Sequence, residues 1–222
     1  TGRIVFDGPL PKSKMMVSLI PYVFGGYVND FENKTGSTWE KDFGFDAKIG
    51  FSSSMNLDLT YNPDFAQVEV DQQVTNIDRF ELFFPEKRQF FLENSDLFSG
   101  FGKNNATPFF SRRIGLDAPV LAGARLSGKI GNDWRIGFMN MTTEETAQFL
   151  ARNFTVASVQ KKVFARSNFG LIFVNKEYLN QPENSHLFNR VAGFDYNLAS
   201  KNNFWDGQLY YQIGRASCRE RV

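Results

Sequence analysis

The residues of this chain that are best suited to chemistry lie in one segment, residues 62–120. Carboxylates, cations and amides are concentrated there in three short motifs, at 62–71, 79–93 and 108–115. The candidate site residues are Asn62, Asp64, Gln67, Glu69, Asp71, Arg79, Glu81, Glu86, Lys87, Arg88, Glu93, Arg112 and Arg113. Because both signs of charge occur in similar numbers and a buried charge needs a partner, this composition favours mutual pairing.

We favour a structural interpretation of this segment, as a plug or constriction held in place by charge-assisted hydrogen bonds. In such a plug Arg112 and Arg113 would each bind a carboxylate partner through two parallel hydrogen bonds. Pairs of adjacent phenylalanines, such as Phe90 and Phe91, would form its core, although such rings are also able to stack on sugars.

Three other kinds of chemistry stay open for the same residues. Two carboxylates at a suitable separation would hydrolyse a glycosidic bond. Arginines exposed in a lumen would select anionic solutes or glycans. The oxygen atoms of Asn62, Asp64, Glu69 and Asp71 are hard ligands suited to calcium, but their spacing matches no EF-hand loop.

Composition excludes several other classes of function. The chain has a single His, a single Cys and a net charge of +1, which argues against zinc sites, nucleophilic triads and nucleic-acid partners. We find no phosphate-binding loop and no dinucleotide fingerprint, so we expect no cofactor. No apolar run reaches 18 residues, the length that suggests a helical membrane span.

Outside the segment, strict alternation of apolar and polar residues is the main signal. Apolar residues occupy the odd positions from Phe43 to Phe51 and again from Met55 to Tyr61. Period two over such lengths predicts strands with one apolar and one polar face. Related units continue to Gln212 and an earlier strand is expected at 15–24, where Pro21 suggests an edge or a bend. We therefore expect about nine strands.

The predicted connections are of two kinds that alternate along the chain. Short turns are expected at 52–54, 131–133, 166–168 and 200–203, and long polar loops at 25–42, 62–120, 142–153 and 175–190. Bacterial outer-membrane barrels have this asymmetry between their two ends. Strands of about 8 to 11 residues also suit a tilted crossing of a bilayer.

A soluble antiparallel sandwich or a lipocalin-like barrel would alternate as well. Charged residues on the polar faces (Asp46, Lys48, Asp58, Arg125 and Lys129), aromatic residues near strand ends and the loop asymmetry favour the membrane protein. The predicted fold is all-β: a partial, antiparallel, up-and-down transmembrane β-barrel with residues 62–120 as an inserted plug or cap. Nine strands cannot close a bacterial barrel, whose strand number is even.

The three motifs of the insert resemble those of the DUF5916 family, and the resemblance covers most of residues 15–212. The series Asn-Pro-Asp-Phe at 62–65, Phe-Phe-Pro-Glu-Lys-Arg at 83–88 and Ser-Arg-Arg-Ile-Gly at 111–115 carries it. The chain departs from the family pattern at Gln89, where Pro is usual, and at Asn94, where Gly is usual. The resemblance implies an outer-membrane β-barrel region in diderm bacteria, often preceded by a family-9-like carbohydrate-binding domain, and it brings no catalytic residues.

We accordingly expect three parts in the chain: a linker at 1–14 from a preceding domain, the partial barrel at 15–212, and a tail at 213–222 that resembles a translated sequencing adapter. The expected function is that of a pore, receptor or surface platform in the bacterial outer membrane, linked to carbohydrate binding or uptake. Membrane lipid and carbohydrate are the expected partners. The alternative is a surface glycoside hydrolase with its acid and base in the insert.

Overall fold

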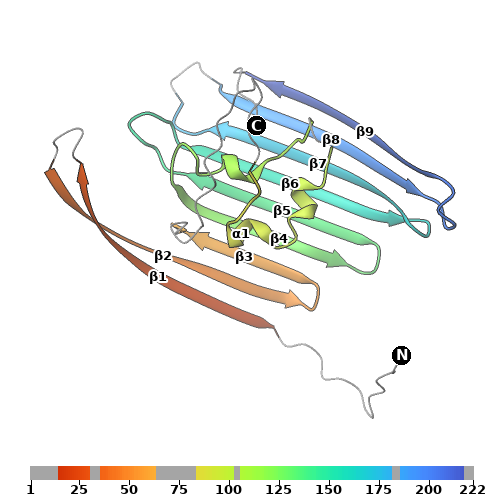
Figure 1. Cartoon of the computed structure of the whole chain (residues 1–222), viewed down its shortest axis with the longest axis horizontal. Coiled ribbons are helices and arrows are strands. Elements are labelled where there is room, and N and C mark those ends of the chain that lie inside the picture. The colour runs from red at the N-terminus through yellow and green to blue at the C-terminus, as the bar shows by residue number, and fades with distance from the viewer. Residues whose placement is uncertain (1–14, 31–35, 64–83, 103–105, 182–185, 218–222) are drawn as a thin grey trace, which may run out of the picture.

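The computed structural model describes residues 15–30, 36–63, 84–102, 106–181 and 186–217. Its main element is one antiparallel sheet of nine strands, each paired with its neighbours in sequence (Figure 1). The strands are β1 (Met16–Asp30), β2 (Gly36–Ser52), β3 (Met55–Tyr61), β4 (Val120–Ile130), β5 (Trp134–Thr143), β6 (Arg152–Val163), β7 (Ser167–Tyr178), β8 (Phe188–Ala199) and β9 (Asp206–Ala216). The predicted all-β, up-and-down antiparallel arrangement is confirmed. The sheet is not closed, and β1 and β9 form its two edges.

The hairpin of β1 and β2 corrects one sequence prediction. Residues 25–42 were expected to form a long loop, but β1 continues to Asp30 and β2 begins at Gly36. The rings of Tyr27 and Trp39, on directly opposed residues of the two strands, pack edge-on with centroids 5.3 Å apart, and such pairs stabilise a hairpin. This end of the sheet therefore has one connection of only five residues, at 31–35.

Edge position suits the one proline inside a described strand. Pro21 lies in β1, which has a partner only on its β2 side. A proline in the middle of a sheet would remove a ladder hydrogen bond, because it has no N–H. The prediction of an edge or bend at Pro21 is confirmed in the form of an edge strand.

The strand register sorts side chains onto two faces that differ in character. One row of directly opposed residues crosses the sheet from β2 to β7 on the face where the insert packs; it consists of Lys48, Asp58, Arg125, Met139, Val156 and Val174. We call this the insert-side face. Neighbouring positions along each strand point to the opposite face.

The opposite face, which we call the apolar face, carries large apolar side chains that are open to solvent. Leu171 is 51% exposed, Leu19 is 63% exposed and Tyr211 is 64% exposed. The same face presents Val17, Val23, Phe43, Phe45, Phe51, Phe138, Phe173, Leu198, Leu209 and Ile213, all of them exposed. Apolar side chains thus remain uncovered along both hairpins at the edges and across the centre of the sheet.

The insert lies on the other side as a second, partial layer (Figure 1). Its short helices are α1 (Gln89–Leu92), α2 (Asp96–Ser99) and the 3-10 helix η1 (Ser111–Arg113), and α2 contacts β5 and β6. Insert residues Phe91, Leu97, Phe98, Phe101, Phe109 and Ile114 form one buried cluster with Met139, Met141, Phe154, Val156, Ile172 and Val174 of the sheet. Among the described residues, no helix has the length and apolar character needed to span a membrane.

Candidate functional site: the insert against the sheet

Arg125 is the centre of the charged contact between the insert and the sheet. Its side chain lies on β4 and is almost fully buried, with 1% of the residue exposed. Nη2 and Nε donate to Oδ2 of Asp58 on β3, at 2.8 and 3.2 Å. Nη1 donates to the backbone carbonyl of Glu93 in the insert at 2.8 Å, and the guanidinium lies 5.2 Å from the ring centroid of Phe90. One arginine thus joins two strands and the insert.

Glu93 fixes the C-terminal end of α1 to the strands next to Arg125. Its Oε2 accepts a hydrogen bond from Lys48 on β2, and Oε1 accepts one from Nδ2 of Asn56 on β3 at 2.8 Å. Oε2 also lies 3.9 Å from Nη2 of Arg125. Lys48, Glu93, Arg125 and Asp58 therefore alternate in sign in the order of their contacts, so the buried Arg125 has a carboxylate on either side.

Asn94 follows directly and makes a turn that most residues would resist. Its φ is +50°, in the left-handed region that favours glycine and tolerates asparagine. Its Nδ2 donates to Oγ of Ser127 on β4 at 3.0 Å. Asn94 therefore keeps a turn that favours glycine and adds a contact to the sheet.

A second pair, Glu86 and Arg88, organises the insert internally. Arg88 donates from Nε and Nη2 to the two carboxylate oxygens of Glu86, at 2.8 and 2.7 Å, in the parallel geometry that makes such pairs strong. The same guanidinium donates to the carbonyls of Ile114 and Ser111, at 2.5 and 2.8 Å, and lies 4.2 Å from the ring centroid of Phe91. Arg88 thereby holds η1 and α1 together.

The carboxyl groups of Glu86 and Glu93 each have a pKa below the ordinary value. Burial by itself would raise the pKa of Glu86, but hydrogen bonds from Arg88 and Ser111 and the charge of Arg88 outweigh burial and lower it. For Glu93, burial is likewise outweighed by the hydrogen bond and charge of Lys48 and by the charge of Arg125, so its pKa is lowered. Stabilised carboxylates of this kind suit a structural ion pair rather than a proton donor.

The remaining described candidates have different surroundings. Nη1 of Arg112 donates to the carbonyl of Pro85 at 2.9 Å, and its guanidinium lies 6.0 Å from the ring of Phe84. Arg113 and Lys87 are half-buried. Arg88 has the two-bond carboxylate geometry, and for Arg112 and Arg113 this geometry stays a prediction.

Asn62, the first residue of the insert, ties three strands together where β3 ends. Its Nδ2 donates to the carbonyl of Phe43 at 2.9 Å and to Oδ1 of Asp42 at 2.5 Å, and its backbone N–H donates to the carbonyl of Leu121 at 2.7 Å. The hydroxyl of Tyr22 donates to the Asn62 carbonyl at 2.9 Å. Asn62 thus sets the direction in which the chain leaves the sheet.

Glycines on the insert-side face form sockets for rings of the insert. A Cβ added to Gly170 on β7 would lie 2.7 Å from Cε1 of Phe101, and one added to Gly137 on β5 would lie 2.9 Å from Cζ of Phe98. Real Cβ atoms do not approach other heavy atoms that closely, so each ring occupies space that a larger residue would fill. The apolar contact between insert and sheet therefore depends on glycine at these two positions.

The structure brings some of the predicted site residues together and separates others. Glu86, Arg88 and the backbone of η1 form one group, Glu93 belongs to the group around Arg125, and Asn62 lies apart at the end of β3. The predictions for Asp64, Gln67, Glu69, Asp71, Arg79 and Glu81 fall outside the described residues. Within the described part of the chain, no group of three or more His, Cys, Asp or Glu is placed to hold a metal ion.

Sequence reasoning missed the partners of the insert on the sheet. Lys48, Asp58 and Arg125 were recognised as residues of the polar faces. The contacts of Lys48 and Arg125 with Glu93, and the pairing of Asp58 with Arg125, were not foreseen. Asn56, Ser127, Gly137 and Gly170 were not singled out. Glycines at insert-facing positions of otherwise regular strands were the available signal, because such glycines often mark a close approach of another group.

Comparison with known proteins agrees with the motifs in the insert. No curated protein and no solved structure matches the chain. Residues 14–120, which include β1 to β3 and the insert, match the family described as "Domain of unknown function (DUF5916)". This part of the chain belongs to the DUF5916 family.

Proposed function

We propose that the chain forms part of an outer-membrane β-barrel of a diderm bacterium, in which the apolar face contacts lipid and the insert occupies the lumen. The observation that carries the proposal is the contrast between the two faces. Phenylalanine, leucine and valine are exposed across the apolar face, while charged residues such as Arg125 and Asp58 are buried under the insert. In a water-soluble protein the reverse distribution is expected, since a large exposed apolar surface is unfavourable.

The borders of the apolar face support lipid as its partner. Near the short turns, the Trp134 ring packs edge-on against Phe169, with centroids 6.4 Å apart, and Nζ of Lys161 lies 4.7 Å from the Trp134 ring. Phe204 and Trp205, next to the last short turn, are 74% and 67% exposed. Aromatic residues with adjacent lysines are typical of the level of lipid headgroups.

The other border is polar. On β5 and β6, Asn140 donates from Nδ2 to Oδ1 of Asn153 and Oγ1 of Thr155, at 3.0 and 2.8 Å. On β7 and β8, Nε of Arg190 donates to Oδ1 of Asn175 at 2.8 Å. On β5 to β8 the apolar band thus ends before the strands reach the longer connections, which is consistent with a surface that leaves the bilayer there.

Within this barrel the insert would act as a plug or constriction. Its fixed charges and phenylalanine core would control which solutes cross the lumen, or would form the floor of a receptor or surface platform for carbohydrate. The rival glycoside hydrolase requires one carboxyl group free to give up a proton and another free to attack or activate water. Glu86 and Glu93 are both held as ion pairs, which supports the plug rather than the enzyme.

The proposal also requires more strands than these nine. Lipid cannot satisfy the backbone N–H and C=O groups at the free edges of β1 and β9, so additional strands must pair with them.

Spin labels on the two faces of β7 test the proposal. In a background in which Cys218, the only cysteine, is replaced by serine, Leu171→Cys places a label on the apolar face and Asn168→Cys places one on the insert-side face. Both positions are exposed, so each accepts a label. In protein reconstituted into vesicles, we expect the label at 171 to be relaxed by oxygen, which concentrates in lipid, and the label at 168 by a water-soluble nickel complex. Equal access of both labels to the nickel complex would contradict the proposal.

A further inference from the structure

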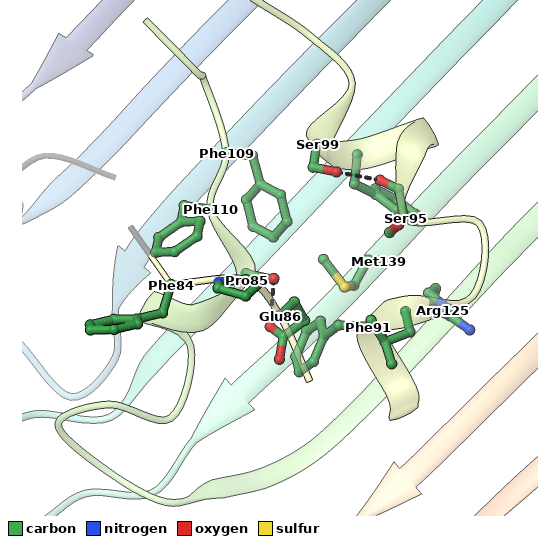
Figure 2. Close-up of a pocket in the computed structure, with 13 residues that line it drawn as sticks. Phe84, Pro85, Glu86, Phe91, Ser95, Ser99, Phe109, Phe110, Arg125 and Met139 are labelled. Carbon is green, nitrogen blue, oxygen red and sulfur yellow. Dashed lines mark hydrogen bonds between the residues drawn. The ribbon is translucent and has the colours of Figure 1, made fainter. Parts of the chain in front are cut away.

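A cavity of about 280 Å³ lies between the insert and the sheet, lined entirely by described residues. Five phenylalanine rings contribute to its wall: Phe84, Phe91, Phe98, Phe109 and Phe110. Figure 2 shows the labelled rings and the Met139 side chain of β5 arranged around it. An apolar cavity of about 150 Å³ is large enough to bind benzene. This cavity has room for a ring with substituents.

The charged groups at the cavity are already neutralised. Glu86 is bound by Arg88 through two hydrogen bonds and by Oγ of Ser111 at 2.6 Å. Arg125 is bound by Asp58 and by the carbonyl of Glu93. A charged ligand would lose its hydration without gaining a free counter-ion here.

The cavity offers few free hydrogen-bonding groups to a ligand rich in hydroxyls. Oγ of Ser99 donates to the carbonyl of Ser95 at 2.9 Å, a bond drawn in Figure 2, and the Ser111 hydroxyl is used by Glu86. A sugar ring buried among these groups would leave several of its hydroxyls without partners, each of which is unfavourable. Ring faces and the Met139 thioether instead suit an aromatic ring.

We infer that this cavity is a binding site for a small uncharged molecule that contains one aromatic ring. The inference is independent of the membrane proposal, because it rests on the contact between the insert and β4–β5 and on no property of the apolar face. Since the cavity walls come from both the insert and the sheet, a bound ring would also hold the insert against the sheet.

Methyl-labelled methionine provides a direct readout of binding. The chain has five methionines, and only Met139 lines the cavity, whereas Met141 is buried beside it and Met55 lies on the apolar face. We expect 4-fluorobenzyl alcohol, added to the whole chain in detergent, to shift the Met139 methyl resonance with saturation. Partition of the probe into the micelle would instead shift Met55 without saturation. A Met139 resonance that does not respond, or that responds without saturation, would overturn the inference.

Two variants test the location of the site. Ser95→Leu adds a side chain at the cavity wall, and Ser99→Leu does so from the next turn of α2; Ser53→Leu, in an exposed turn, is the matched control. We expect at least one of the cavity variants to keep the fold and to weaken probe binding tenfold or more, while the control binds normally. Normal binding in both folded cavity variants would contradict the site. Methyl glucoside serves as the sugar probe, and a saturable Met139 shift with it would contradict the aromatic preference.

Discussion

Arg125 shows how a residue of a predicted watery face becomes part of a dry interface. Alternation along β4 assigns it correctly to the polar face, but the insert covers that face and leaves the arginine 1% exposed. An arginine there is stable only because Asp58 neutralises it and because a backbone carbonyl accepts its remaining donor. The stability of the buried Arg125 thus depends on the negative charge of Asp58 and on the position of the Glu93 carbonyl.

Replacing Arg125 by alanine should therefore be among the most damaging single changes in the chain. It leaves Asp58, which is 8% exposed, without its cation, and loss of one partner from a buried pair typically costs about 3–5 kcal/mol. Urea unfolding of the detergent-solubilised protein measures the change. Arg135→Ala is the matched control, because the Arg135–Asp96 pair is far more open and should contribute at most about 1 kcal/mol. Equal effects of the two substitutions would contradict this account of Arg125.

Substitutions of Asn94 test whether its left-handed turn constrains the insert. Its φ of +50° is accessible to glycine but strained for a β-branched residue. We expect Asn94→Gly to lose only the hydrogen bond to Ser127, and Asn94→Val to lose that bond and add about 1–2 kcal/mol of backbone strain. Protease protection of the insert should fall in the order wild type, glycine, valine. A valine variant as well protected as the glycine variant would show that the turn does not constrain this residue.

At the scale of elements, the strands were predictable and the contacts of the insert were not. Period-two alternation located the nine strands, because apolar residues recur at alternate positions over much of each strand. It failed at 25–42, where Tyr27 and Trp39 stabilise a hairpin extension without regular alternation. The pairs Lys48–Glu93 and Asp58–Arg125 join residues 45 and 67 positions apart, and no local pattern in one sequence encodes such distances.

The glycine sockets lead to a prediction for the insert as an element. Gly170→Val should displace Phe101 from β7 and loosen the insert, at about 1–3 kcal/mol for overpacking, while leaving the charge network around Arg125 untouched. Gly25→Val is the control, since a Cβ at Gly25 of β1 would meet nothing within 4 Å. Hydrogen exchange of residues 89–102 compares the two variants. Faster exchange in both variants, or in neither, would contradict the close packing of Phe101 on Gly170.

The insert should also be released by acid. The pKa values of Glu86 and Glu93 are lowered in the folded protein below their ordinary 4.5, so protons bind more readily when the insert is detached. Their stabilisation is therefore complete at neutral pH, declines as the pH falls below about 4.5, and is lost below the folded pKa values. Limited proteolysis across this range measures release. The double variant Glu86→Gln, Glu93→Gln should lose most of this dependence, and an unchanged acid transition in it would assign the release to other groups.

At the scale of the whole molecule, the sheet combines two features that are unfavourable in water: an exposed apolar face and two unpaired edges. A second layer of protein would cover the face but leave the mixed borders of aromatic and polar residues unexplained. In the proposed outer-membrane barrel, a bilayer would account for the face and its borders together, and closure with further strands would remove the edges. The insert-side face would then be shielded from lipid, which is consistent with its buried ion pairs.

Substitutions at two adjacent residues of β1, one on each face of the sheet, test whether the apolar face contacts lipid. Leu19 points to the apolar face and Ser18 to the insert-side face, and both are exposed. In a soluble sheet, arginine at either position would change stability little, because both side chains would reach water. In a bilayer, Leu19→Arg should destabilise the folded protein by up to about 2–4 kcal/mol, depending on its depth, and Ser18→Arg should be nearly neutral. Refolding of the protein into vesicles against denaturant measures both variants. Equal and small effects would mean that the apolar face does not meet lipid.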